Sequence, residues 1–368
     1  MTARTDLLYS DTEEELRAAV RDLLTDRCDA AAVLARAETG RPHDPALWRT
    51  LAADIGAAGL LVPEKLGGQG AGHREAAVVL EELGRAVAPV PYLTSAVLAT
   101  EILLGCDTAE AGPLLRELAA GDVVCVPALP LTLAPGAALP APVRDAGGGI
   151  LTGTVTTVAD AAAADVLLVL ADTGLYAVRA ASAALTPRVA LDLTRPPATV
   201  AFDRAGGTRL ADPATARAAV AGALLSGAGL LASEQVGLAE WCLTETVRYV
   251  RGRHQFNRPV GSFQAVKHRL AGLWLDVASA RAAARAAADA LATGAPDAPL
   301  TVAVAQAFCS GVAVRAAEEC VQLHGGIGMT WEHPAHLYLK RAKADSLALG
   351  TAGHHRGLVA DFAELPAP

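Results

Sequence analysis

The chain has 368 residues, of which 52% are hydrophobic and 19% are charged. This composition excludes a disordered protein and allows two or three domains around a large buried core. The formal net charge of −8 argues against nucleic acid or an anionic membrane surface as the main partner.

The cysteines and the N-terminus indicate the compartment. Six cysteines are scattered without a C-x-x-C pair, which is typical of free buried thiols in a reducing compartment. The start of the chain is acidic and lacks the apolar segment of a signal peptide. The apolar run 218–233 is shorter than the ~20 residues of a membrane span. We therefore expect a cytoplasmic protein without a membrane span.

Residues 1–120 have the pattern of a helical domain. Ser10 and Glu13 have the spacing of a capping box, and they precede apolar residues that share one helical face. Further helical patterns surround Trp48 and cover residues 75–89. The first third of the chain is therefore predicted to be helical.

Residues 121–210 have a different pattern, because short β-branched or apolar runs are separated by Gly, Pro and Asp. The runs cover residues 123–126, 150–158, 165–171, 174–178 and 198–202. They predict a small β-barrel or sandwich. A long helical crossover, a G-x-G-x-x-G motif and a Walker loop are all missing, which argues against a Rossmann unit or a P-loop site.

Residues 211–368 are predicted to form a C-terminal four-helix bundle. Asp212 and Pro213 suit the N-cap and first position of a helix. A second helix, from Ser262 to about Ala292, carries apolar residues at alternating steps of three and four. Such an alanine-rich seam favours close helix packing and often an oligomer core. The predicted fold class is therefore α+β, mainly α.

One polar segment follows the helix that starts at Asp212. It reads 249-YVRGRHQFNRPVG-261 and contains Arg253, Gln255 and Phe256. A guanidinium can hold a phosphate in bidentate geometry, and Gln255 and Phe256 can flank an aromatic ring system. The alternative is an arginine at a helix C-terminus that pairs with free backbone carbonyls.

A second polar segment, 320-CVQLHGGIGMTWEHP-334, ends a long apolar helix. It places Gln322 and His324 beside two adjacent glycines, Gly325 and Gly326. Without a Cβ, these glycines allow positive φ and a close approach of another object. That object is either a neighbouring helix or a ligand.

Together with the helix, β, helix order, the segments RHQFNRPVGSFQAVKH and QLHGGIGMTWEHP resemble the acyl-CoA dehydrogenase family. Residues 48–70 and 81–91 are similar to the family's first helical domain, so the resemblance covers about residues 8–356. It implies a tetramer that binds FAD in a cleft between the β domain and the C-terminal bundle.

The resemblance also implies which residues hold the cofactor. In the family, an arginine of an R-x-x-F motif and a Gln–Leu/Ile–x–Gly–Gly turn hold the pyrophosphate and adenosine end of FAD across a subunit interface. Together with the threonine of the later Gly–Thr pair, the matching residues here are Arg253, Gln255, Phe256, Gln322, Leu323, Gly325, Gly326 and Thr351.

The family's reaction is the α,β-dehydrogenation of an acyl-CoA thioester, in which a carboxylate takes the α-proton and flavin accepts the β-hydride. In most members the base is a Glu immediately before Gly–Thr, and Leu349 stands there in this chain. In others the base lies about 26 residues before the R-x-x-F arginine, and that count leads to Gly227. Neither residue can accept a proton, so no catalytic residue is predicted.

A third departure lies in the middle domain. Family members contact the flavin ring with a Trp–Ile–Thr strand, and this chain has Thr157, Val158 and Ala159 at the matching positions. The motifs for the ADP half of FAD are therefore kept, whereas those for the flavin ring and substrate are degraded.

The favoured interpretation is a subunit without the catalytic Glu in a heterotetramer with a homologous catalytic subunit. The complex would oxidise an acyl-CoA of the fatty-acid or steroid side-chain type and pass electrons to an acceptor. One alternative is a homotetrameric dehydrogenase with another base, namely Glu234, Glu240 or Asp345. Another is a flavin-free, CoA-binding scaffold.

No metal site is predicted from the sequence. His333 and His336 have i, i+3 spacing, but the sequence offers no third ligand near them.

Overall fold

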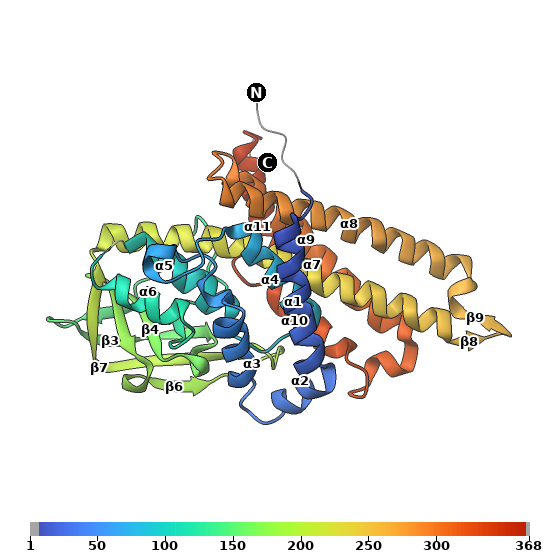
Figure 1. Ribbon diagram of the computed structural model, residues 1–368, viewed down its shortest axis with the longest axis horizontal. Coiled ribbons are helices and arrows are strands. Elements are labelled where there is room, and N and C mark those ends of the chain that lie inside the picture. The colour runs from blue at the N-terminus through green and yellow to red at the C-terminus, as the bar shows by residue number, and fades with distance from the viewer. Residues whose placement is uncertain (1–6, 107, 366–368) are drawn as a thin grey trace.

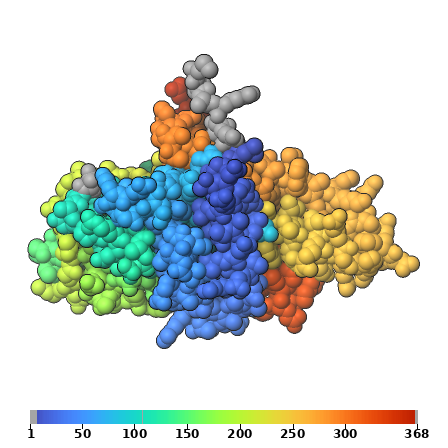
Figure 2. Space-filling model, in the orientation of Figure 1, coloured from blue at the N-terminus to red at the C-terminus, as the bar shows by residue number. Residues whose placement is uncertain are grey.

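The computed structural model describes residues 7–106 and 108–365. Helices come first, a β domain follows, and long helices form the last part, which confirms the predicted fold class. The sheet lies at one end of the molecule, and the long helices extend to the opposite end (Figure 1). In the space-filling view, the end of the bundle near residue 255 projects beyond the other parts (Figure 2).

The N-terminal part is built from short helices that begin at the predicted cap. Ser10 Oγ accepts a hydrogen bond from the Glu13 N–H, and Glu13 Oε2 accepts one from the Ser10 N–H at 2.6 Å. The capping box is therefore confirmed. The helices are α1 (Asp11–Arg27), α2 (Ala30–Ala37), α3 (Pro45–Arg49), α4 (His73–Ala86), α5 (Thr100–Cys106) and α6 (Ala111–Ala119).

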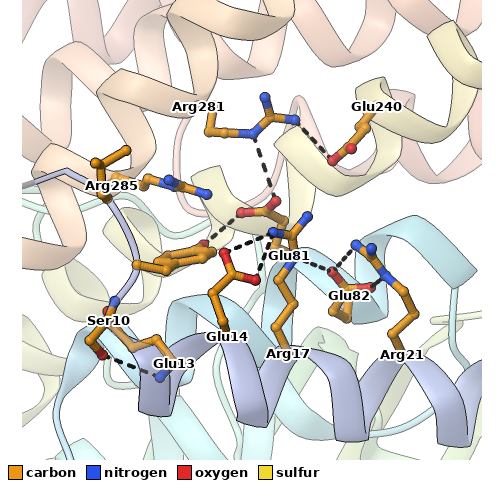
Figure 3. A network of polar contacts seen from close by, with 12 residues as sticks. Ser10, Glu13, Glu14, Arg17, Arg21, Glu81, Glu82, Glu240, Arg281 and Arg285 are labelled. Atoms are coloured by element: carbon orange, nitrogen blue, oxygen red, sulfur yellow. Dashed lines mark hydrogen bonds and ion pairs between the residues drawn. The ribbon is translucent and has the colours of Figure 1, made fainter.

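Ion pairs between a buried carboxylate and partly exposed arginines hold α1 against α4 (Figure 3). The carboxylate of Glu82 is almost fully buried, and it accepts hydrogen bonds from Arg17 at 3.1 Å and Arg21 at 2.6 Å. The Tyr9 hydroxyl donates to Glu81 at 2.7 Å. Because buried carboxylates are costly without partners, these contacts fix where the first helix lies.

The middle domain is a closed barrel. β4 pairs with β2, β2 with β3, β3 with β7, β7 with β5, and β5 with β4, while β1 pairs with another part of β4 and β6 with another part of β7. Each predicted run contributes to a strand, but no run predicted β2 or β6, whose segments Val-Arg-Asp and Ala-Leu-Thr-Pro are not continuous apolar runs. The strands are β1 (Cys125–Pro127), β2 (Val143–Asp145), β3 (Ile150–Ala159), β4 (Val166–Ala171), β5 (Gly174–Arg179), β6 (Ala184–Pro187) and β7 (Pro197–Ala211).

The C-terminal part packs around one central helix, α7, which contacts α4, α8 and α9. It begins as predicted, since Asp212 accepts hydrogen bonds from the Ala214 and Thr215 N–H groups and Pro213 occupies the first turn. The elements are α7 (Pro213–Gly252), β8 (His254–Gln255), β9 (Arg258–Pro259), α8 (Gln264–Ala292), α9 (Ala298–His324), α10 (Ala335–Asp345) and α11 (Ala352–Phe362).

The apolar seam of α8 is buried along only part of its length. Leu273, Val277 and Ala284 are buried against the bundle, whereas Phe263 and Val266 remain partly exposed. The beginning of the seam therefore lies where the bundle projects from the body.

Two helical segments, Pro213–Gly252 and Ala298–Met329, are long and apolar enough to cross a membrane by length and composition alone. In each segment, more than half of the most apolar stretch of 18 residues is buried inside the fold, 61% in the first and 56% in the second. Packing in the bundle core accounts for their apolar character.

Candidate functional site

An open groove of about 570 Å³ lies at the projecting end of the bundle, where α7 and α9 both end. The groove brings together most of the residues predicted to hold the dinucleotide tail. These are Arg253, Gln255, Gln322, Leu323, Gly325 and Gly326. Tyr249 also lines the groove, and sequence reasoning missed it. Tyr249 could have been predicted, because it lies one helical turn before Arg253 and therefore on the same side of the helix.

The two glycines leave free space in the groove. Gly325 has φ of +63°, a conformation that side chains other than glycine rarely adopt. No described atom lies within 4 Å of the place where a Cβ would stand at Gly325 or Gly326. The helix-packing explanation is therefore wrong within this chain, and a phosphate can approach the backbone N–H groups here.

Arg253 forms the C-cap of α7, and its guanidinium has no hydrogen-bond partner within the part of the chain that the structure describes. It therefore does not pair with helix carbonyls, and it remains available to an anion. Two other predicted residues lie outside the groove. Phe256 is 86% exposed at the tip of the β8–β9 hairpin, and Thr351 is the N-cap of α11.

The other half of the predicted site is closed. A cavity of about 20 Å³ with apolar walls lies in the cleft between the middle domain, α5 and α7. Leu98, Leu131 and Leu349 are among the residues that line this cavity. Small-molecule sites usually need ~300 Å³ or more, so neither a flavin ring nor an acyl chain fits here.

Two backbone hydrogen bonds of Leu131 close this cleft. The Leu131 N–H donates to the Thr157 carbonyl at 3.1 Å, and the Leu131 carbonyl accepts from the Leu349 N–H at 2.7 Å. The loop between β1 and β2 is thereby joined to β3 on one side and to the turn after α10 on the other. Sequence reasoning missed Leu131, because nothing in its local pattern indicates these long-range bonds.

The two positions that carry the base in the family lie side by side. A Cβ at Gly227 would lie 3.2 Å from Leu349 Cδ1 and 2.4 Å from Leu98 Cδ2. Leu349 is 1% exposed and has φ of +52°, a conformation that costs a non-glycine residue on the order of 1 kcal/mol. The turn thus directs an aliphatic side chain toward Gly227 and the apolar cavity.

The alternative bases lie elsewhere. Glu234 and Asp345 belong to a buried ion cluster, and Glu240 pairs with Arg281 of α8 at 2.9 Å. None of these three carboxyl groups lines the apolar cavity. The structure therefore gives none of them a position from which to reach a substrate in the cleft.

The ion cluster joins the β6–β7 loop to α7 and α10. Arg195 contacts Glu234 at 2.8 Å and Asp345 at 3.1 Å, and Arg341 contacts Glu234 at 2.6 Å. Arg341 also contacts Asp192 of the loop. All five residues are buried. The cluster therefore acts as a charged connection between the middle domain and the bundle.

Two guanidinium groups face three carboxyl groups in this cluster, so one carboxyl is in excess. Burial, reinforced by the negative charge of Glu234, raises the pKa of Asp345 well above its usual range. Burial also acts to raise the pKa of Glu234, but Arg195 and Arg341 outweigh it and lower that pKa. Asp345 is therefore the carboxyl that retains a proton most readily.

Comparison with known proteins gives consistent matches along the chain. Residues 10–124 match the acyl-CoA dehydrogenase N-terminal domain family, and residues 217–363 match the acyl-CoA dehydrogenase C-terminal domain family. The chain is 37% identical over 339 residues to acyl-CoA dehydrogenase IpdE2 of Mycobacterium tuberculosis. That similarity covers 92% of this chain and 93% of the relative.

Two solved structures are also similar. The first is the ChsE4–ChsE5 complex from Mycobacterium tuberculosis, with 30% identity, a TM-score of 0.86, and coverage of 99% of this chain and 100% of that chain. The second is the Tcur3481–Tcur3483 steroid ACAD, with 30% identity, a TM-score of 0.83, and coverage of 96% and 98%.

The two acids of the ion cluster should respond differently to neutralisation. Glu234→Gln should destabilise the protein by about 3–5 kcal/mol at pH 7, because Arg195 and Arg341 stay buried without their shared carboxylate. Asp345→Asn replaces a carboxyl that already favours its protonated form. Its effect on the melting temperature at mildly acidic pH should therefore be small.

The pH dependence follows from the signs of the shifts. The raised pKa of Asp345 gives stability that is present at acid pH and is lost as pH rises through that pKa. Asp345→Asn removes this loss. The melting temperature of the variant, relative to that of the unsubstituted protein, should therefore rise as pH increases. Melting curves from pH 5 to 9 check this. A destabilisation by Asp345→Asn that equals that of Glu234→Gln at every pH would contradict the charge assignment.

A carboxylate should not be tolerated at Leu349. Leu349→Glu places a charge among leucines without a partner, and we expect the melting temperature to fall by roughly 5 °C or more. Leu347→Glu is the matched control, because Leu347 lies two residues away and is 54% exposed. Thermal unfolding of both variants measures the difference. Equal stability would show that the cleft opens easily to water, against the closed packing described above.

Proposed function

Because the chain belongs to the acyl-CoA dehydrogenase family, we propose that it is the subunit without a catalytic base in a heteromeric acyl-CoA dehydrogenase. Its part is to hold the dinucleotide tail of FAD for a homologous catalytic subunit. The observation that carries this proposal is the contrast between the 570 Å³ groove at the tail-binding residues and the 20 Å³ cavity at the ring position.

Members of the family are FAD-dependent oxidoreductases that act on CH–CH bonds. In this chain, Arg253 would hold the pyrophosphate, and the turn from Gln322 to Gly326 would hold the adenosine end beside it. When bound, FAD supplies the hydride acceptor. The partner subunit would contribute the carboxylate that takes the α-proton and the space for the acyl group, since this chain has neither in its cleft.

Two similar structures support a pair of unlike chains, because the names ChsE4–ChsE5 and Tcur3481–Tcur3483 each denote two different subunits. We extend this arrangement to a heterotetramer in the cytoplasm. Its substrate would be an acyl-CoA of the fatty-acid or steroid side-chain type, and its electrons would pass to a separate acceptor.

The outer surface of the bundle supports association. Trp274 and Leu275 of α8 and Phe308 of α9 are large apolar side chains that remain exposed. Exposed apolar side chains of this size on long helices are typical of subunit interfaces. A homotetramer with another base is less well supported, because Glu234, Glu240 and Asp345 lie outside the cavity.

The proposal predicts the flavin content of the protein. Expressed alone, the chain should be colourless or weakly yellow. Co-expressed with a homologous chain that has Glu at the position of Leu349, it should form a yellow complex with fewer flavins than chains. Absorbance at the flavin band, together with subunit stoichiometry, measures this. Flavin bound in every chain of a stable homotetramer would contradict the proposal, and a complex without flavin under any pairing would support a scaffold instead.

A substitution in the groove tests whether this chain contributes to FAD binding in the complex. Arg253→Ala in the complex should weaken FAD binding about 10–100-fold, the value of a charge-assisted phosphate contact. Arg251→Ala is the matched control, because Arg251 is exposed on the same helix end but does not line the groove. Equal FAD affinity of the two variants would contradict the assigned role of Arg253.

A further inference from the structure

Three residues that are distant in the sequence meet at the inner wall of the groove. Glu245 comes from α7, His324 ends α9, and His333 precedes α10. One ligand atom from each lies within 4.8 Å of the other two. We propose that Glu245, His324 and His333 form a binding site for one divalent transition-metal ion of the zinc class. The site adjoins the groove assigned to the dinucleotide tail, because His324 lines that groove, but its argument does not depend on FAD binding.

The distances suit a metal centre. The Nε2 atom of His324 lies 3.9 Å from Glu245 Oε1, and the Nε2 atom of His333 lies 3.7 Å from the same oxygen. Around a tetrahedral zinc ion with ligand bonds of about 2.0–2.1 Å, ligand atoms are ~3.3 Å apart. Side-chain shifts of about half an ångström would bring each histidine to this separation from Glu245, and the two histidine nitrogens, which lie within 4.8 Å of each other, would have to approach by up to ~1.5 Å.

The position and hydrogen bonding of His324 suit a metal ligand. It is 2% exposed, and its Nδ1 lies 2.7 Å from the Cys320 carbonyl. An N–H at Nδ1 donates to that carbonyl, which leaves the lone pair on Nε2, and a second hydrogen bond of this kind is typical of metal-bound histidine. The Nε2 atom is buried and has no hydrogen-bond partner within the described part of the chain. Stacking on Tyr249, at 4.3 Å between ring centroids, also orients the ring.

The other two ligands have contacts that a metal ion would have to change. The Ala335 N–H donates to His333 Nδ1 at 3.2 Å, so a neutral His333 carries its proton on Nε2. With a metal ion on Nε2, the neutral ring would carry its proton on Nδ1, and the hydrogen bond from Ala335 would be lost. Glu245 accepts hydrogen bonds from Arg248, whose side chain is largely exposed and can turn toward water.

The ligand set and its position define the class of ion. Two imidazoles and one carboxylate suit zinc and similar divalent transition metals better than calcium or magnesium. The three side chains supply three ligands, and a fourth, such as water, would have to enter from the adjoining groove. The sequence alone pairs His333 with His336 and gives no third ligand. The fold instead supplies Glu245 and His324, and His336 is not part of the group.

The test is metal binding by the full-length chain without an affinity tag. Calorimetric titration with Zn²⁺ at pH 8 should show one ion per chain. Co²⁺ should give the intense visible absorption of a tetrahedral site. His333→Ala and Glu245→Gln should each weaken binding by about 100-fold or more, since even outer contacts of metal sites contribute 10–100-fold.

His268→Ala is the matched control, because His268 is exposed on α8 and lies outside the group. It should bind Zn²⁺ like the unsubstituted chain. Circular dichroism and melting curves show that each variant is folded. The proposal is overturned if the folded chain binds no Zn²⁺ tightly, or if His333→Ala and Glu245→Gln bind it as well as His268→Ala does. Neither readout needs flavin or a partner, so the result is independent of the proposed function.

Discussion

Two backbone hydrogen bonds of Leu131 close the cleft between the middle domain and the C-terminal bundle. The N–H and carbonyl of Leu131 bond to Thr157 of β3 and to Leu349 of the turn after α10, so one loop joins the middle domain to the bundle. Because the surrounding side chains are apolar, breaking these bonds would expose both unpaired peptide groups and hydrocarbon surface. The cleft is therefore filled by the protein's own chain.

The closed cleft and the open groove lie at different places on α7, and the proposed function rests on this separation. At the groove, Gly325 and Gly326 present bare backbone with no described atom within 4 Å of either Cβ position. At the cleft, Leu98 and Leu349 occupy the space around Gly227. The cluster of Arg195, Glu234 and Arg341 adds a buried ionic connection between the middle domain and α7. A ligand could therefore bind in the groove while the cleft stays closed.

Local features were predictable because they depend on neighbouring residues. The caps at Ser10 and Asp212 follow from side chains that accept hydrogen bonds within three residues, and the order of helices and strands follows from periodicity. The surroundings of Glu234 were not predictable in this way. Its partners Arg195 and Arg341 are 39 and 107 residues away, and only the assembled fold converts this candidate base into a buried structural ion. The same holds for Leu131.

The most direct test of this account is an anaerobic titration with an acyl-CoA thioester. The isolated, full-length chain is mixed with FAD, and the flavin absorbance is then followed as acyl-CoA is added. The account predicts no bleaching, because Leu349 takes no proton and the cleft admits no acyl group. Bleaching of the flavin by the isolated chain, without a partner subunit, would contradict the account.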